Sequence, residues 1–218
     1  MNSPLMTILH VLWAESGRPE RAGDDDVLGV VVRMMLAQAT SKANAARAFG
    51  ELVDRFCGDW ESVAHASVDD VAGAIEIGGL SRQKAPRIQA LLRAVCRDFG
   101  EYSLDELRTW DPVDALEYLT GFDGVGPTTA TFALMDAAGM DLFPINGGIR
   151  RMLVRLGLLE PSASDADAHA VAREMLLPGD AYAAHMALVR HARTICVARV
   201  PKCERCAVAA SCASARME

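Results

Sequence analysis

Four cysteines near the end of the chain have a spacing that suits a metal centre. They follow the pattern C-x6-C-x2-C-x5-C, formed by Cys196, Cys203, Cys206 and Cys212. Thiolates gathered this closely in a chain without a secretion signal indicate a bound metal rather than a pair of disulfides. The spacing allows a zinc ion with four thiolate ligands or an iron–sulfur cluster held in the same way. Cys57 and Cys96 lie far from this group, and we expect both to be buried free thiols.

A second stretch, residues 119–152, combines a glycine-rich turn with a helix start. Gly124 and Gly126 lie in the turn, and Pro127 follows directly. Proline at the first helical position after such a turn signals the start of a helix. The preceding segment, DPVDALEYL, has the Asp-Pro start of a helix of its own. The stretch predicts two helices joined by a tight hairpin whose amides could bind an anion, and a tight turn without a ligand explains the same residues.

These segments resemble, in order, motifs of the endonuclease III family of DNA glycosylases. FDGVGPTTA, at 122–130, resembles the family's helix-hairpin-helix pattern L-P-G-V-G-x-K-T-A. INGGIRR, at 145–151, resembles V-D-T-H-I-x-R. MMLAQATSK at 34–42, IGGLSRQKA at 77–85 and HMALVRHARTIC at 185–196 resemble three further blocks of the family. The likeness covers most of the chain and implies an all-α, two-lobed helix-hairpin-helix glycosylase fold.

The resemblance also selects among the possible metal centres. The cysteine spacing matches the family's iron–sulfur loop, so the likeness implies a [4Fe–4S] cluster, with zinc as the minor alternative. Three cations in or beside this loop, Arg199, Lys202 and Arg205, would then point positive charge at DNA phosphates. An ordinary solvated surface is the alternative reading of the same cations.

Further residues would face DNA if the family likeness holds. It implies that Gln38 fills the space left by an extruded base, that Leu80 acts as an apolar wedge, and that Gly124 and Gly126 place amides on phosphates. Two simpler interpretations remain open. Gln38 could mark the end of a buried helix near Thr40, and Leu80 could be a hydrophobic staple for the helix that follows it.

The two positions most important for chemistry depart from the family pattern. The family's lysine falls on Thr128, and its aspartate falls on Asn146. A hydroxyl cannot form the Schiff base that strand cleavage needs, and a neutral amide lacks the charge that stabilises an electron-poor sugar. Asp141 is the one carboxylate we consider as a stand-in, and Asn146 could simply cap the next helix. We therefore expect no AP-lyase activity and weak base release.

Two classes of function compete. The first is a base-excision-repair DNA glycosylase that flips a damaged base, with oxidised pyrimidine favoured over mismatched or alkylated bases. The second is a catalytically silent DNA- or lesion-binding protein on the same scaffold. An iron–sulfur electron carrier has only the cysteines in its favour. The chain ends six residues after Cys212, without the extra domain of the glycosylases that remove adenine opposite oxidised guanine, so we do not expect that subclass.

The elements that must position these residues are almost all helices. Helical spacing predicts helices over roughly 4–16, 26–39, 41–57, 68–76, 83–99, 112–120, 127–139, 146–157, 165–176 and 180–195. Pro86 implies that its helix starts late or has an irregular first turn. The family likeness implies a six-helix barrel lobe over 22–138 and an iron–sulfur lobe built from 1–21 and 139–218. DNA would lie across the cleft between the lobes.

Composition fits a globular protein of 218 residues with a net charge of −7, which is unexpected for a protein that binds nucleic acid. Cations nevertheless gather over 185–206, where a local basic face could bind phosphates. The apolar segments 4–14 and 27–39 resemble neither a signal peptide nor a membrane span. We expect a cytoplasmic monomer whose partner is double-stranded DNA with a damaged base or an abasic site.

Overall fold

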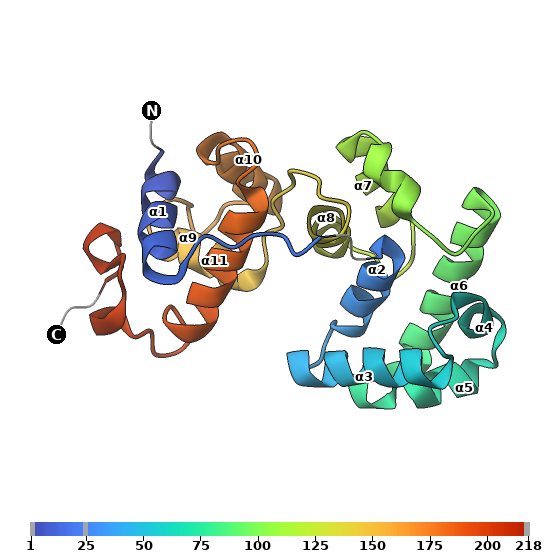
Figure 1. Ribbon diagram of the computed structural model, residues 1–218. Coiled ribbons are helices and arrows are strands. Elements are labelled where there is room, and N and C mark those ends of the chain that lie inside the picture. Colours follow the sequence, from blue (N-terminus) through green and yellow to red (C-terminus); the bar gives the residue numbers. More distant parts are fainter. Residues whose placement is uncertain (1–2, 24–25, 216–218) are drawn as a thin grey trace. The chain divides into compact units, whose positions relative to one another are not determined.

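The computed structural model describes residues 3–23 and 26–215, and over these ranges all regular structure is helical (Figure 1). This confirms the predicted all-α class. The α-helices are α1 (Pro4–Ser16), α2 (Val27–Leu36), α3 (Lys42–Arg55), α4 (Trp60–His65), α5 (Val68–Ala74), α6 (Ser81–Phe99), α7 (Pro112–Thr120), α8 (Pro127–Asp136), α9 (Gly147–Arg155), α10 (Asp165–Met175) and α11 (Ala181–Thr194). Short 3₁₀ helices are η1 (Glu76–Gly78), η2 (Asp105–Thr109), η3 (Cys203–Arg205) and η4 (Ala209–Ser211).

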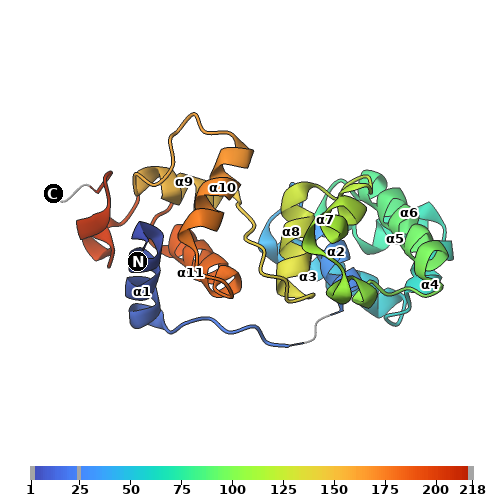
Figure 2. The same cartoon turned by 90° about the horizontal axis from the view of Figure 1, so that it is seen from above.

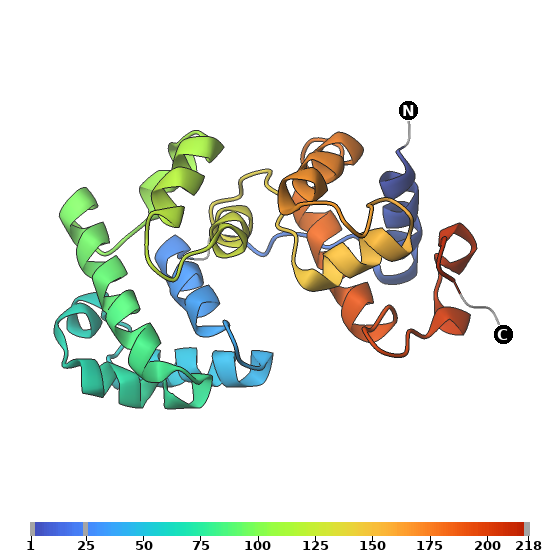
Figure 3. The ribbon, with the colours of Figure 1, turned by 180° about the vertical axis from the view of Figure 1, so that it is seen from behind.

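The chain divides into two compact units, which Figures 2 and 3 show from two further sides. The first unit, Gly23–Met140, contains α2 to α8 and is called the hairpin unit below. The second, Met1–Ala22 with Asp141–Glu218, contains α1 and α9 to α11 and is called the cysteine unit. The N-terminal helix thus folds with the C-terminal part of the chain.

Helix α2 is the core element of the hairpin unit. Its sequence, VLGVVVRMML, is apolar around most of its circumference, as expected of a helix surrounded by others. It packs against α3, α6 and α8. Asp26 caps its start, because the carboxylate accepts the amides of Leu28 and Gly29, both at 3.0 Å. The hairpin helix α8 is therefore fixed directly on the core of its unit.

Two features of this unit differ from the sequence-based expectations. Helix α4 was not predicted, because six residues are too few to show a helical period. Helix α6 begins at Ser81 with Pro86 inside it, so a late start at 83 is wrong. Pro86 is exposed, and the ring is accommodated on the outer side of the second turn.

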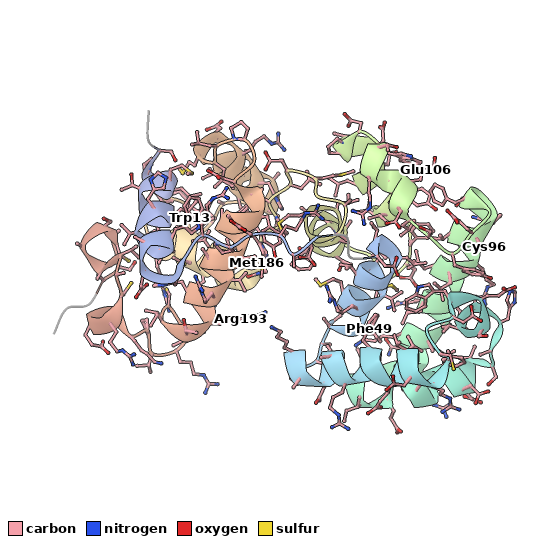
Figure 4. The ribbon with its side chains drawn as sticks, in the orientation of Figure 1. Trp13, Phe49, Cys96, Glu106, Met186 and Arg193 are labelled. Carbon is pink, nitrogen blue, oxygen red and sulfur yellow. The ribbon has the colours of Figure 1, made fainter. Side chains whose placement is uncertain are left out.

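The two isolated cysteines are also more accessible than predicted. Cys57 is exposed, and Cys96 on α6 is only half-buried (Figure 4). Cys57 lies in the turn after α3 with φ of +53°, and Gly58 continues this left-handed turn with φ of +72°. The expectation of two buried thiols is therefore wrong for Cys57.

In the cysteine unit, α1 and α9 pack against α11. The core is made mainly of leucines, isoleucines and alanines, with Leu5, Leu9 and Leu188 among the most deeply buried. Trp13 extends this contact, since its indole Nε1 donates to the carbonyl of Ala183 at 3.4 Å (Figure 4). None of the described helices is both long and apolar enough to cross a membrane.

Candidate functional site

The hairpin between α7 and α8 contains two glycines, and their local surroundings differ. Gly124 has φ of +87°, and a Cβ there would lie 3.2 Å from Cε of Met35 and 3.3 Å from Cδ of Arg87. Only glycine fits this conformation and space without strain. Gly126 is the N-cap of α8 with φ of −81°, and nothing lies within 4 Å of where its Cβ would be. At Gly126, therefore, the missing side chain leaves the backbone open to solvent.

The amides of this hairpin are available to a ligand. The N–H groups of Gly124, Gly126 and Thr128 donate no hydrogen bond to any residue in 3–23 or 26–215, and no side chain caps α8. Unpaired amides at the start of a helix carry partial positive charge and suit an anion. Asp123, also in the hairpin, is paired with Arg87 at 2.8 Å and is largely exposed.

Gln38 lies in the turn after α2 and braces the hairpin. Its Nε2 donates to the carbonyl oxygen of Gly124 at 2.8 Å and to Oγ1 of Thr129 at 3.4 Å. Since α2 ends at Leu36 and Gln38 is exposed, Gln38 does not end a buried helix. The amide is already oriented toward the hairpin in the free protein.

Leu80 stands at the start of α6 with its side chain presented to solvent. It has φ of +52° and is 51% exposed. A hydrophobic staple would instead pack its side chain against the first turns of its helix. The exposure is what an apolar wedge requires.

The residues at the family's catalytic positions are neutral. Thr128 is exposed in the first turn of α8, in the hairpin unit. Asn146 lies in the cysteine unit and caps α9, as its Oδ1 accepts the amides of Gly148 at 2.9 Å and Ile149 at 3.0 Å. The capping role considered for Asn146 is therefore observed. It uses the oxygen of the side chain, while the Nδ2 donor has no partner in the described part of the chain.

Asp141 is held by backbone amides near the start of α11. Oδ2 accepts the amide of Gly179 at 2.7 Å, and Oδ1 accepts that of Ala181 at 3.3 Å. Both oxygens therefore anchor the segment that leads into α11. This is a structural use of the only carboxylate proposed as a stand-in for the missing aspartate.

The four clustered cysteines line one cavity of about 850 Å³, together with Arg155. All four are free thiols and half-buried. The Sγ atom of Cys206 lies 3.3 Å from Nε2 of His191, and burial raises the pKa of the Cys206 thiol. His191 is itself buried, which lowers the pKa of its imidazole and favours the neutral ring.

Two arginines of α9 hold the loop that carries the cysteines. Arg155 donates to the carbonyls of Val197 at 2.7 Å and Ala198 at 2.8 Å, and it lies 3.4 Å from Sγ of Cys196. Arg151 donates to the carbonyl of Cys196 at 3.0 Å. Both roles were missed in the sequence, since an arginine on an amphipathic helix gives no sign of which carbonyls it will meet.

The predicted basic residues of this loop, Arg199, Lys202 and Arg205, are all exposed. Arg199 and Lys202 also line the cysteine cavity. None of the three has an ion-pair partner in residues 3–23 or 26–215. The loop thus presents cations to solvent beside four thiols.

Comparison with known proteins shows to which family this fold and these motifs belong. The sequence profile of the HhH-GPD superfamily of base excision DNA repair proteins matches residues 32–177. The chain therefore belongs to this superfamily. Its resemblance to the endonuclease III type of helix-hairpin-helix DNA glycosylase, expected from the motifs, is confirmed by the relatives described next.

Two curated relatives and one solved structure are similar over long stretches. Endonuclease III of Sulfolobus acidocaldarius is 26% identical over 189 residues, which cover 86% of this chain and 82% of that protein. A putative DNA glycosylase of Arabidopsis thaliana is 30% identical over 140 residues, 64% of this chain, but the match spans only 47% of that protein. The structure of a trapped endonuclease III–DNA covalent intermediate has a TM-score of 0.83 at 18% identity, covering 99% of this chain and 98% of that one.

Proposed function

We propose that this protein binds duplex DNA containing a damaged base or an abasic site, releases the base slowly, and does not cut the strand. The observation that carries the proposal is the pair of neutral residues, Thr128 and Asn146, in an all-helical chain of the HhH-GPD superfamily. Solved endonuclease III structures that share this fold contain DNA, in covalent and non-covalent complexes. These complexes support duplex DNA as the partner of this chain.

DNA binding is supported by the free amides of the hairpin and by the basic loop. Gly124 and Gly126 would donate to phosphate oxygens of one strand, and Arg199, Lys202 and Arg205 would meet the backbone as well. Gln38 and Leu80 would enter the duplex where the base leaves. Such contacts are mostly to phosphate and are therefore insensitive to sequence.

The weak chemistry follows from the side chains at the two family positions. Breaking the glycosidic bond builds positive charge on the deoxyribose, and a fixed carboxylate beside the sugar stabilises that charge. The amide of Asn146 carries no charge, and its oxygen is occupied by the cap of α9. Thr128 offers a hydroxyl, which cannot form an imine with the sugar carbon. Loss of such an electrostatic group typically costs about 10²–10⁴ in rate.

We further propose that Cys196, Cys203, Cys206 and Cys212 hold a [4Fe–4S] cluster. In the described ranges no three His, Cys, Asp or Glu side chains are close enough to hold a single metal ion. A four-iron cluster is larger than one ion, and the cavity lined by the four thiols leaves room for it. Bound there, the cluster would crosslink the loop that presents the basic residues.

The cluster proposal is tested by metal analysis of the purified protein. We expect a brown protein with about four irons per chain. Cys203→Ser should lose iron and destabilise the cysteine unit, whereas Cys57→Ser, at an exposed cysteine outside the cavity, should change neither. A colourless protein with stoichiometric zinc would overturn the cluster.

The lesion class is proposed from the family type alone, with oxidised pyrimidine as the first candidate. A catalytically silent lesion-binding protein is the second candidate function. It is favoured by Asp141, whose carboxylate is tied to the amides of Gly179 and Ala181 and so is not free to replace the missing aspartate. We expect the protein to act as a monomer in the cytoplasm in either case.

A panel of duplexes tests the function. Each duplex carries one lesion (oxidised pyrimidine, mismatched uracil or thymine, alkylated base, or abasic site), and binding, base release and strand cutting are scored separately. We expect preferential binding to at least one lesion, slow release of its base and no strand cutting. Absence of binding at low salt would overturn the proposal.

A further inference from the structure

Lys84 is a buried lysine whose ammonium group meets three backbone carbonyls. It lies near the start of α6 and is only 4% exposed. Its Nζ donates to the carbonyl oxygens of Leu36 at 2.7 Å, Gln38 at 2.7 Å and Gly78 at 3.0 Å. An ammonium has three donors, so all of them are used. All three acceptors are neutral.

The carbonyls belong to two segments that are far apart in sequence. Leu36 ends α2, and Gly78 ends η1. Carbonyls at the end of a helix lack donors within the helix and carry partial negative charge, which attracts a cation. Lys84 therefore joins the turn after α2 to the turn before α6.

Burying a charged amine costs free energy, so filling this space does not by itself explain why a lysine is present. Burial disfavours the charged amine and lowers the pKa of Lys84. An uncharged side chain of similar length would fill the same space without that cost. The three carbonyl contacts are what only the ammonium provides.

Both turns that Lys84 holds contain disfavoured backbone. Ala39, next to Gln38, has φ of +54°, and Leu80, two residues after Gly78, has φ of +52°. Residues other than glycine rarely adopt the left-handed conformation, and such conformations persist when their surroundings hold them. The two turns carry Gln38 and Leu80, both exposed and both in the hairpin unit.

We propose that Lys84 is a positioning residue that locks the turns 37–41 and 78–80 into one body, so that Gln38 and Leu80 enter the duplex together. Lys84 does not touch DNA; it acts through main-chain carbonyls. The part of this inference that concerns DNA rests on the proposed function. The linkage of the two turns through Lys84 does not depend on that function.

The linkage is tested on the free protein by amide hydrogen exchange. Lys84→Met keeps the length of the side chain and removes its donors, and Lys42→Met removes a charge from an exposed lysine as the matched control. In Lys84→Met we expect the hydrogen-bonded amides of the two turns, Ala37 and Gln38 in the first and Gly78 and Gly79 in the second, to exchange at least about tenfold faster (~1.4 kcal/mol less protection). The rest of the hairpin unit should be unchanged. Lys42→Met should match the wild type. Unchanged exchange in either turn of a folded Lys84→Met would overturn the proposal.

The wild type supplies a second measurement if Lys84→Met does not fold. If Lys84 holds the two turns together, they open in a single event. The free energy of opening measured by amide exchange should then fall with denaturant concentration with the same slope in both turns. Two different slopes would contradict the linkage.

The consequence for DNA is tested with 2-aminopurine opposite an abasic-site analogue, where unstacking raises the fluorescence. Wild-type protein should raise it, whereas Lys84→Met should lose most of the rise, as Leu80→Ala should. Affinity of Lys84→Met for undamaged duplex should stay within about twofold, because phosphate contacts remain. A full rise with Lys84→Met would overturn the positioning role. If the wild type gives no rise in fluorescence, both the positioning role of Lys84 and the proposed function are overturned. The hydrogen exchange experiment would still decide whether Lys84 links the two turns.

Discussion

At Asn146 the structural role of capping α9 can be tested separately from the catalytic role of a carboxylate. Its Oδ1 caps α9 through two amides, and aspartate caps a helix equally well. The change Asn146→Asp therefore adds a carboxylate without removing the cap. We expect base release to rise by about 100-fold or more, because the sugar would gain the missing negative charge. Single-turnover release from a lesion duplex measures this.

A control for this variant is Asn146→Ser, which caps α9 without a charge. It should fold like the wild type and release no more base. If Asn146→Asp folds and binds the lesion but is no faster than the wild type, the missing carboxylate is not what limits the reaction. Asp141→Asn would then test whether Asp141 acts in its place.

The second prediction for a single residue concerns Thr128 and the absence of strand cleavage. Strand cleavage by β-elimination starts from a Schiff base, which needs an amine. At the family's lysine position Thr128 offers only a hydroxyl, and Lys84, a buried lysine of the same unit, has all three donors engaged. Borohydride should therefore trap no covalent adduct between the wild type and abasic DNA. A trapped adduct would contradict this directly, and its mapped residue would name the amine.

The sequence indicated these residues but not their contacts. The family motifs located Thr128 and Asn146, and the N-cap role followed from Asn before an apolar helix. The contacts of Asp141 and Lys84 could not be predicted, because their partners are backbone groups distant in sequence. Side-chain to backbone contacts of this kind leave no pattern in residue types.

At the scale of the element, the hairpin predicts a contrast between two substitutions of one residue. A Cβ at Gly126 would meet nothing within 4 Å, so Gly126→Ala should bind DNA within about twofold of the wild type. Gly126→Asp adds a negative charge beside the amides proposed to bind phosphate, and it should weaken binding to every sequence alike, by about tenfold or more. Fluorescence anisotropy with two unrelated duplexes measures both. Equal binding by the two variants would argue against the hairpin as the phosphate site.

Helix α11 carries a buried histidine that predicts a dependence of stability on pH. His185 donates from Nδ1 to the carbonyl of Pro144 at 2.9 Å, and burial lowers the pKa of its imidazole to about 4. An unfolded histidine takes up a proton near pH 6.5, so this contribution is complete above that pH and is lost as the pH falls toward 4. His185→Asn can keep the donor without titrating.

We therefore expect the free energy of unfolding of the wild type to fall by about 3 kcal/mol more than that of His185→Asn between pH 7 and pH 4. Urea unfolding at a series of pH values measures the difference. Parallel curves for the two proteins would show that His185 is not the group responsible.

Most helices were predictable because their starts and periods are explicit. Ser3 caps α1, and Asp111 with Pro112 begins α7. The short helix α4 and the start of α6 were not predictable. The first is too short for a period, and the second depends on Leu80 in a left-handed conformation that sequence does not favour.

At the scale of the whole molecule, a net charge of −7 coexists with a proposed phosphate-binding surface. Local cations and amides, rather than net charge, determine contacts to phosphate once DNA is close. The acidic remainder should slow association at low salt and should not abolish binding.

We propose that this chain combines lesion recognition with weakened catalysis. The most direct test is a single-turnover experiment with protein in excess over the lesion duplex that it binds most tightly in the panel, in which occupancy and base release are followed in the same sample. We predict nearly complete occupancy with base release about 10²–10⁴ times slower than for an endonuclease III that has both family residues. Release at the rate of that enzyme, from the same duplex at the same occupancy, would show that catalysis is not weakened.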